Sequence, residues 1–360
     1  MGKKIWIKAN GNGIIATGHI RRCMTIANEL KLLGAEVEFV LSDEDSADLL
    51  RTLSDEEGQQ YDARILHTVF SEPMQDIPML EEMFAEEKPD FYLMDSYFLK
   101  EDYFEAVNEI IKKNGLATKT GFIDDLYKFD YPVDLVVNYD VEVPKDFYSA
   151  PHRLLGAEYA PLRKQFEGID YEVIPLAKRA FLSAGGTDPY HIIGDLLKEV
   201  YENEGPCRTI PDFMLFTCDV IVGALFDEDY VKELKELAAK YPAITLHESA
   251  PDMAELMKNC DFAVTAGGTT LYELCAVGVP TVVYSMADNQ VEFVKAFDKA
   301  GAAKYVGDIR EEEKIVQKIV SWGIAAIEDQ NFRKKMSDKA RKLVGGGGAN
   351  KIAHAILEII

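Results

Sequence analysis

The sequence predicts an α/β fold with two doubly wound, parallel-sheet domains that face each other across a cleft. Three observations lead to this prediction. The 360 residues are enough for two domains. Short apolar segments alternate with amphipathic ones in each half of the chain, which favours parallel sheets with helices on both faces. Glycine-rich turns join a strand to a helix near the N-terminus and again in the second half.

The first half has the pattern of one such domain. An apolar strand over 5–7 leads into the turn 11–18 and then into a helix that stops at Gly34. A second helix is expected over 101–113. The other expected strands are 35–41, 64–66, 91–94, 120–123 and 135–138.

The second half repeats the alternation after a break. Four prolines punctuate residues 141–175, which we interpret as the inter-domain crossing. Strands are then expected at 179–183, 213–222, 244–247, 262–265 and 281–283. Helices are expected up to about 201 and at 227–240, 251–258, 271–277, from Ala287 onward, and at 311–326, 329–343 and 352–359. The predicted domains are 1–155 and 156–345, with a C-terminal helix in 346–360 that packs back on the first domain.

Charge and composition exclude several classes of function. A net charge of −23 argues against nucleic acid or an anionic membrane as partner. No apolar run approaches the ~20 residues of a membrane span, and no signal-peptide core follows Met1. The five cysteines, Cys207 among them, form no CxxC pair, which argues against a zinc site or a disulfide framework. We therefore expect a cytoplasmic protein without membrane insertion, as a monomer or a weak dimer.

His19 is the candidate catalytic residue. It stands beside Gly18 where the first glycine-rich turn enters a helix, at the carboxyl edge where open α/β sheets bind ligands. A helix N-terminus favours the neutral imidazole, which suits a general base near pH 7. The alternative is a histidine that only caps or packs.

The second half contains two further loops of this kind. Gly267-Gly268-Thr269-Thr270 follows a buried strand, and its backbone amides and hydroxyls suit a diphosphate. Glu273, one turn later, is placed to accept hydrogen bonds from a ribose. Gly185-Gly186-Thr187-Asp188 is the other loop. The alternatives are tight strand–helix turns, a solvated Glu273 and an Asp-Pro helix start.

Polar residues end other predicted strands. Asn289 and Gln290 could contact sugar hydroxyls or acetamido groups, although Asp288 equally suits a helix N-cap. Tyr97 could contact substrate or be a partly buried core residue. Asp124 and Asp125 could orient His19 or hold a metal. No DxD segment is placed as in metal-dependent sugar transferases, so we expect neither metal nor cofactor.

These segments together resemble a known family, the nucleotide-sugar hydrolases of pseudaminic acid biosynthesis. Those enzymes act on UDP-2,4-diacetamido-2,4,6-trideoxy-β-L-altropyranose, and their wider group resembles the lipid II N-acetylglucosaminyltransferase. Spore-coat polysaccharide biosynthesis proteins share much of the pattern. The resemblance rests on Gly18-His19-Ile20-Arg21-Arg22-Cys23, Asp95-Ser96-Tyr97, residues 154–163, Gly185–Pro189, Ala266–Leu274 and Ala287–Gln290.

The resemblance implies a GT-B fold of two Rossmann-like domains and assigns roles within it. His19 would activate a water. Ser249, after the strand 244–247, would lie where uracil is received. The residues implied in substrate binding are Gly18, Arg22, Tyr97, Gly186, Thr187, Ser249, Gly268, Thr269, Thr270, Glu273, Asn289 and Gln290.

The implied reaction is metal-independent attack of water at the anomeric carbon of a UDP-sugar, with inversion and release of UDP. The Gly268–Thr270 amides would stabilise the leaving diphosphate. The first alternative is a GT-B glycosyltransferase for cell-surface or spore polysaccharide. The second is a protein that binds a nucleotide sugar without turnover. A nicotinamide dehydrogenase is disfavoured, because the first turn lacks a proper GxGxxG followed by an acidic residue.

Overall fold

The computed structural model describes residues 2–12, 15, 17–202 and 216–360. Gly13, Ile14 and Ala16 of the first glycine-rich turn, Cys207, and the first three residues of the strand region expected at 213–222 therefore lie outside the described residues. The chain divides into two compact units. The first comprises residues up to Arg163 together with Gly347–Ile360, and the second comprises Lys164–Gly346.

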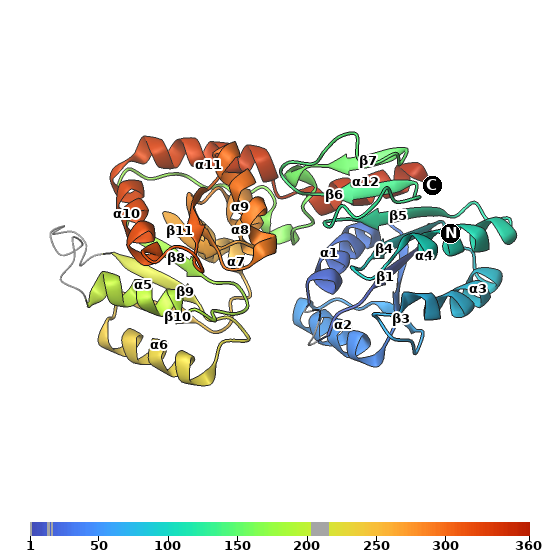
Figure 1. The fold of residues 1–360 in the computed structure, drawn as a ribbon, viewed down its shortest axis with the longest axis horizontal. Coiled ribbons are helices and arrows are strands. Elements are labelled where there is room, and N and C mark those ends of the chain that lie inside the picture. Colours follow the sequence, from blue (N-terminus) through green and yellow to red (C-terminus); the bar gives the residue numbers. More distant parts are fainter. Residues whose placement is uncertain (1, 13–14, 16, 203–215) are drawn as a thin grey trace. The chain divides into compact units, whose positions relative to one another are not determined.

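The first unit is a parallel α/β sandwich (Figure 1). Its described residues form a seven-stranded sheet in the order β3-β2-β1-β4-β5-β6-β7, with every pair parallel. The strands are β1 (Lys4–Ala9), β2 (Glu36–Leu41), β3 (Asp62–Ile65), β4 (Phe91–Asp95), β5 (Lys119–Ile123), β6 (Leu135–Asn138) and β7 (His152–Leu155). The helices are α1 (Gly18–Leu32), α2 (Glu44–Glu57), α3 (Ile77–Glu86), α4 (Glu101–Lys113) and α12 (Gly348–Ile359).

Helices cover both faces of this sheet because both faces of its central strands are apolar. In β1, Ile5 and Ile7 belong to a core shared with α1, α2 and α12, whereas Trp6 belongs to a core shared with α3 and α4. Such strands, buried on both faces, are characteristic of parallel sheets.

The second unit has the same architecture. Its described residues form a six-stranded parallel sheet in the order β10-β9-β8-β11-β12-β13. The strands are β8 (Arg179–Ser183), β9 (Thr217–Ile221), β10 (Ile244–His247), β11 (Phe262–Ala266), β12 (Thr281–Ser285) and β13 (Lys304–Asp308). The helices are α5 (Ile192–Tyr201), α6 (Glu228–Lys240), α7 (Met253–Lys258), α8 (Thr269–Val277), α9 (Asp288–Ala300), α10 (Ile315–Glu328) and α11 (Gln330–Val344).

The predicted α/β class with two doubly wound domains is confirmed, while some elements were missed from the sequence. The helices α2 and α3 and the strands β7 and β13 were not among the predicted elements. The strand β7 lies inside the proline-punctuated stretch 141–175, so the first unit continues to Arg163. Its short sequence His152–Leu155 shows little alternation, which is the signal that identifies a strand.

Two glycines allow close backbone contacts where the chain leaves the second unit. Within that unit Gly346 has φ +77°, and a Cβ there would lie 2.3 Å from the carbonyl oxygen of Phe166. Within the first unit, a Cβ at Gly348 would lie 2.1 Å from the carbonyl oxygen of Ala160. Neither position tolerates a side chain without moving the backbone.

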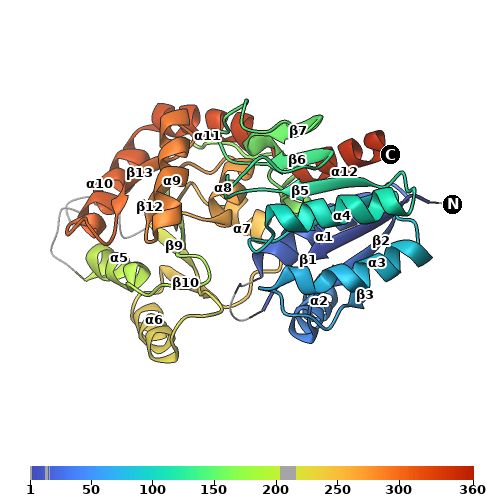
Figure 2. The same cartoon turned by 45° about the vertical axis from the view of Figure 1, so that its right-hand side comes forward.

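The helix α12 belongs to the core of the first unit (Figures 1 and 2). It packs on α1, with Ile352 and Ile356 fully buried. The side-chain amide of Asn350 donates a hydrogen bond of 2.8 Å to Glu29 of α1. The last segment of the chain therefore supports the helix that begins with Gly18 and His19.

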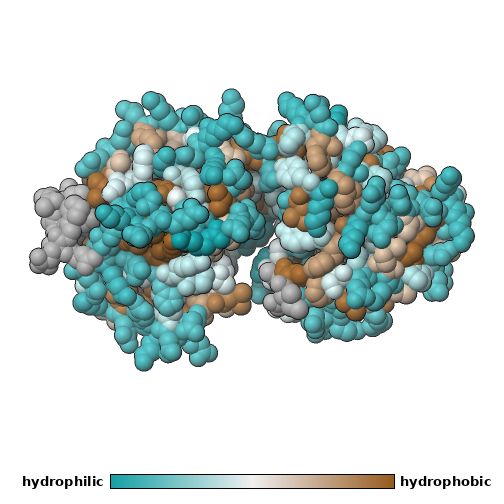
Figure 3. All heavy atoms as spheres, in the orientation of Figure 1, coloured by the Kyte–Doolittle hydropathy of each residue, from teal (hydrophilic) through white to brown (hydrophobic). Residues whose placement is uncertain are grey.

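The surface of each unit is largely hydrophilic in the view of Figure 3, and the apolar residues on it form small groups. Every helix among the described residues is too short or too polar to cross a bilayer.

We predict that Ile352→Ala lowers the stability of the first unit by about 2–5 kcal/mol, because it opens a cavity between α12 and α1. Hydrogen–deuterium exchange followed by mass spectrometry should show faster exchange of the α1 amides and unchanged exchange in the second unit. His354→Ala, on the exposed face of the same helix, is the matched control and should leave exchange unchanged. Unchanged α1 exchange in Ile352→Ala would contradict this role for α12.

Candidate active site

The first unit brings its candidate residues to the point where its strand order reverses. The strands β1 and β4 are neighbours, with Ala9 opposite Asp95, while the chain runs outward from β1 to β2 and from β4 to β5. Ligands of doubly wound sheets bind at the carboxyl edge at such a switch point. The helix α1 begins there with Gly18, and a Cβ at Gly18 would meet no atom within 4 Å.

His19 is held by a buried carboxylate. Its Nδ1 lies 2.6 Å from Oδ1 of Asp95, the last residue of β4, and both side chains are buried. The Nε2 atom makes no hydrogen bond to any other described residue. One ring nitrogen of His19 is therefore fixed, and the other has no hydrogen-bond partner among the described residues.

Arg22 neutralises the same carboxylate. It lies three residues after His19, one turn along α1, so the two side chains leave the helix on the same side. Its Nε donates to Oδ2 of Asp95 and its Nη2 donates to Oδ1, each at 2.5 Å. Burial would raise the pKa of Asp95, but the charge of Arg22 and the hydrogen bonds from Arg22 and His19 hold it well below its usual value. Asp95 is therefore ionised at neutral pH.

The other arm of Arg22 reaches the next two strands. Its Nη1 donates to Oδ2 of Asp125 at 3.0 Å and to the hydroxyl of Tyr139 at 2.5 Å. Burial would lower the pKa of Arg22, but these neighbours and Asp95 raise it well above its ordinary value. Burial and the nearby carboxylates also raise the pKa of Tyr139 to about 12, although Arg22 opposes them. Tyr139 is therefore protonated at neutral pH, and its hydroxyl oxygen accepts the hydrogen bond from Arg22.

Tyr97 covers His19 from the solvent side. Its ring stands edge-on to the imidazole, with 4.3 Å between ring centroids, and its hydroxyl donates to Oδ2 of Asp125 at 3.1 Å. The residue is 42% exposed. Burial and Asp125 raise the pKa of Tyr97, so it too is a neutral donor. Tyr97 is thus both a neighbour of the histidine and part of the exposed surface at this edge.

The two consecutive aspartates after β5 have different surroundings. Asp124 is buried and accepts hydrogen bonds from the hydroxyls of Tyr131 and Tyr148 and from backbone amides of its own loop. It therefore stabilises the loop, and it makes no hydrogen bond to His19. Asp125 acts on His19 only through Arg22 and Tyr97. The residue that orients His19 is Asp95, which the sequence offered only as part of the segment Asp95-Ser96-Tyr97, with no role of its own.

The second unit has its own switch point between β8 and β11. The loop after β8 carries Gly186 and Thr187, both exposed, and Gly185 with φ +83°. Asp188 is buried and accepts the Ile192 and Ile193 amides at 3.0 Å, so it caps α5, consistent with the helix-start reading of this loop.

The loop after β11 leaves the backbone at Gly268 accessible to solvent. This residue is the N-cap of α8, it is exposed, and a Cβ on it would meet no atom within 4 Å. Thr269 and Thr270 form the first turn of the helix, with Thr269 exposed and Thr270 half-buried. Gly267, in contrast, is packed closely, since a Cβ there would lie 2.6 Å from Cγ1 of Val294 in α9. One glycine thus allows α9 to approach and the next leaves the helix start accessible.

The remaining second-unit candidates lie at different distances from this switch point. Asn289 is exposed in the first turn of α9, which begins beside α8 because β11 and β12 are neighbours. Gln290 accepts the Met286 amide at 2.9 Å. The N-cap of α9 is Ala287, and Asp288 pairs with Arg310 instead. Glu273 is half-buried in α8.

Ser249 is the outlying candidate. It is exposed and follows β10, the edge strand, which is separated from β8 by β9. Neighbouring strands lie about 4.8 Å apart, so the strand that precedes Ser249 lies about 10 Å along the sheet from β8, on the near side of the switch point.

The structure thus groups the candidates by unit. His19, Arg22 and Tyr97 form one contact network, joined by Asp95, Asp125 and Tyr139, and Gly18 precedes His19 at the start of α1. Most second-unit candidates occupy adjacent loops of the other sheet. Among the described residues, no group of three or more His, Cys, Asp or Glu side chains is arranged to hold a metal ion.

Comparison with known proteins supports a relation to glycosyltransferases. Residues 209–343 match the family model described as glycosyl transferases group 1. The spore coat polysaccharide biosynthesis protein SpsG of Bacillus subtilis is 26% identical over 207 residues, which are 56% of this chain and 57% of that protein. The chain spans 61% and 57% of the lengths of the two curated relatives it matches.

Solved structures share the fold over the whole chain. MurG of Acinetobacter baumannii aligns with a TM-score of 0.68 at 14% identity, covering 99% of each chain. The UDP-GlcNAc 2-epimerase of Neisseria meningitidis, bound to UDP-GlcNAc, aligns with a TM-score of 0.65 at 13% identity, covering 99% of this chain and 100% of that one. The two Rossmann-like units of this chain therefore have the GT-B fold.

Proposed function

We propose that this protein transfers a sugar from a UDP-sugar to an acceptor hydroxyl, with His19 as the general base. The observation that carries the proposal is the Asp95–His19 pair at the switch point of the first unit. The match of residues 209–343 to group 1 glycosyl transferases supports glycosyl transfer, and the similarity to SpsG supports a role in polysaccharide biosynthesis.

The Asp95–His19 pair fixes the tautomer of the base. An ionised carboxylate only accepts hydrogen bonds, and Oδ1 of Asp95 lies 2.6 Å from Nδ1 of His19, closer than the Arg22 Nη2 donor at 3.0 Å, so we assign the proton to Nδ1. The lone pair is then on Nε2, which is free to take a proton from an attacking hydroxyl. When it does so, Asp95 also stabilises the positive imidazolium that forms.

The second unit would bind the leaving group. The first amides of α8 have no partner within the helix, and the start of a helix carries partial positive charge. Gly268, Thr269 and Thr270 expose this helix start, and we assign the diphosphate to it. Charge stabilisation of the departing UDP lowers the barrier without a general acid.

Hydrolysis is the second candidate, with water as the acceptor. It is favoured by the sequence segments that resemble the hydrolases of pseudaminic acid biosynthesis, including Gly18–Cys23 and Ala287–Gln290. The same base would serve, because the proton removed from water or from a sugar hydroxyl goes to Nε2 of His19.

The direct test incubates the protein with a panel of UDP-sugars in H₂¹⁸O and EDTA, with and without sugar acceptors. The panel includes the diacetamido-trideoxy-altrose compound. We expect UDP release that requires an acceptor. Release without acceptor, with ¹⁸O in the free sugar, would replace transfer by hydrolysis. Label in the phosphate would refute attack at the anomeric carbon, and UDP binding without any turnover would refute both reactions.

We predict that His19→Asn lowers kcat by about 10²–10⁴-fold, because that is the usual contribution of a general base. The affinity for UDP, measured by calorimetry, should remain unchanged. His152→Asn, at an exposed histidine of the same unit, is the matched control and should keep full activity. Nearly intact turnover in His19→Asn would show that another group accepts the proton.

We predict that Asp95→Asn lowers kcat by about 10²–10⁴-fold as well, since the amide no longer enforces the Nδ1–H tautomer. It should also lower the free energy of unfolding at pH 7 by about 3–5 kcal/mol, because Arg22 loses a buried partner. Chemical denaturation of the wild type and the variant at several pH values measures this difference.

The sign of the pH dependence follows from the lowered pKa of Asp95. Its contribution to stability is fully present above the pKa of an unfolded aspartate, about 3.9, and is lost as the pH falls through the folded value. The difference in the free energy of unfolding between wild type and Asp95→Asn should therefore become smaller below about pH 4. Asp140→Asn is the contrasting control. Burial raises the pKa of Asp140, so replacing this carboxylate should not lower the free energy of unfolding in the way that Asp95→Asn does. If the difference in the free energy of unfolding between wild type and Asp95→Asn stayed constant with pH, the claim that Asp95 is ionised and paired would be contradicted.

A further inference from the structure

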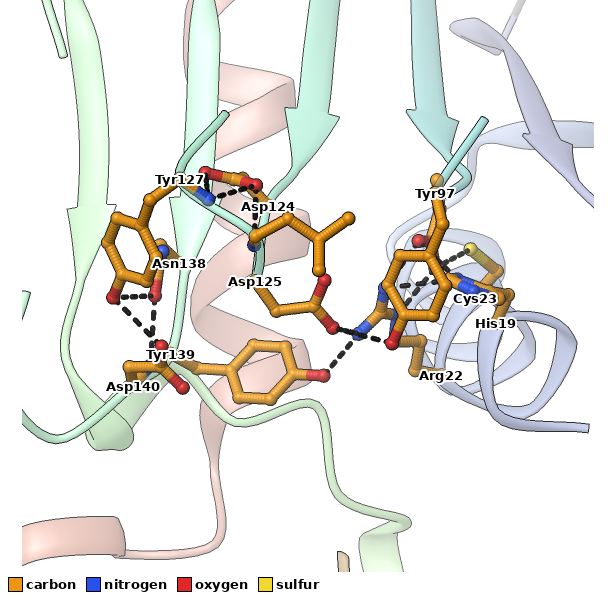
Figure 4. A network of polar contacts seen from close by, with 12 residues as sticks. His19, Arg22, Cys23, Tyr97, Asp124, Asp125, Tyr127, Asn138, Tyr139 and Asp140 are labelled. Atoms are coloured by element: carbon orange, nitrogen blue, oxygen red, sulfur yellow. Dashed lines mark hydrogen bonds and ion pairs between the residues drawn. The ribbon is translucent and has the colours of Figure 1, made fainter. Parts of the chain in front are cut away.

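One carboxylate oxygen of Asp125 has no hydrogen-bond partner in the described part of the chain. Both of its side-chain hydrogen bonds, from Nη1 of Arg22 at 3.0 Å and from the Tyr97 hydroxyl at 3.1 Å, fall on Oδ2 (Figure 4). Oδ1 makes no hydrogen bond to any residue that the structure describes. The side chain is 23% exposed, so this oxygen belongs to the accessible surface of the edge.

The unused oxygen is also rigidly placed. Arg22 is itself fixed, because its Nε and Nη2 are held by the buried Asp95. Tyr97 adds a second donor from a different strand end. A carboxylate held from two directions keeps its free oxygen in one position, which is what a binding site requires of a recognition group. The arrangement is therefore a preformed hydrogen-bond acceptor.

This acceptor lies close to the base. The Tyr97 ring contacts His19 and its hydroxyl contacts Asp125, so a single side chain separates the two residues. Leu126, the next residue, is 40% exposed and, like Tyr97, presents apolar surface beside the carboxylate. A sugar ring offers the matching chemistry, with hydrogen-bond donors on its rim and C–H groups on its faces.

We propose that Asp125 selects the sugar. Its Oδ1 accepts a hydrogen bond from a hydroxyl or an amide N–H of the transferred group, and its negative charge disfavours sugars that carry a carboxylate. The proposal rests on the proposed function, since it assumes that a nucleotide sugar reaches this edge. It assigns the substrate to the neutral sugars and excludes uronic acids, because two carboxylates in contact repel each other.

The test measures binding to the wild type and to Asp125→Ala, Asp125→Asn and Asp130→Asn. Calorimetry would use UDP, a panel of neutral UDP-hexoses and UDP-N-acetylhexosamines, and UDP-glucuronic acid. Asp125→Ala should weaken binding of the best neutral UDP-sugar about 10–100-fold, as for a hydrogen bond to a charged group. The affinity for UDP should not change. Asp125→Asn keeps an acceptor for Arg22 and Tyr97, so it should bind UDP-glucuronic acid more tightly than the wild type does.

Asp130→Asn is the matched control, because Asp130 lies in the same loop and, among the residues described, accepts only the Ser149 amide, at 2.9 Å. Thermal unfolding of each variant checks that it folds. An equal loss of UDP and UDP-sugar affinity in Asp125→Ala, or an unchanged neutral-sugar affinity, would overturn the proposal. So would a wild type that binds no UDP-sugar more tightly than UDP.

Turnover measured on the same samples separates this proposal from the proposed function. Sugar-dependent binding that requires Asp125 but leads to no UDP release would refute glycosyl transfer and retain the role of Asp125. UDP release with unchanged kcat/KM in Asp125→Ala would retain glycosyl transfer and refute the role of Asp125.

Discussion

The first unit depends on one buried negative charge. Asp95 ends the central strand β4 with no exposed surface, and such a carboxylate is stable only if it is paired and hydrogen-bonded. Arg22 and His19 provide the pairing, and both come from the first two turns of α1. The position of α1 on the sheet, the tautomer of His19 and the approach of Arg22 to Asp125 are therefore set by the same carboxylate. A substitution that appears to affect only catalysis will also affect the stability of this unit.

The fold could be predicted from the sequence because its signals are local. Apolar strands, glycine stops and amphipathic helices each occupy a few consecutive residues, and their alternation alone implies a parallel sheet. The strand β7 escaped prediction because it is a short edge strand whose place is set by pairing with β6. Such pairing arises only in the folded chain, and four residues are too few to show a pattern that would predict it.

The candidate site was predictable in part for the same reason. Gly18 and His19 stand out because a glycine-rich turn precedes them. The role of Asp95 depends on β4 lying next to β1, a non-local fact that follows from the strand order. Asp124 and Asp125 were equivalent in the sequence, yet one turns inward to two tyrosine hydroxyls and the other outward to Arg22 and Tyr97. The direction of a side chain in a loop cannot be deduced from its neighbours in sequence.

The place of α12 in the first unit has a consequence for how the chain folds during synthesis. Residues 347–360 complete the core around α1, yet the ribosome adds them only after the whole of the second unit. Until then the apolar face of α1 that receives Ile352 and Ile356 is uncovered, and the nascent first unit exposes it. The second unit is continuous in sequence and can close its own core earlier. The core of the first unit can therefore be completed only after residues 347–360 have been made, and a translation stall before them leaves the helix that bears His19 without its support.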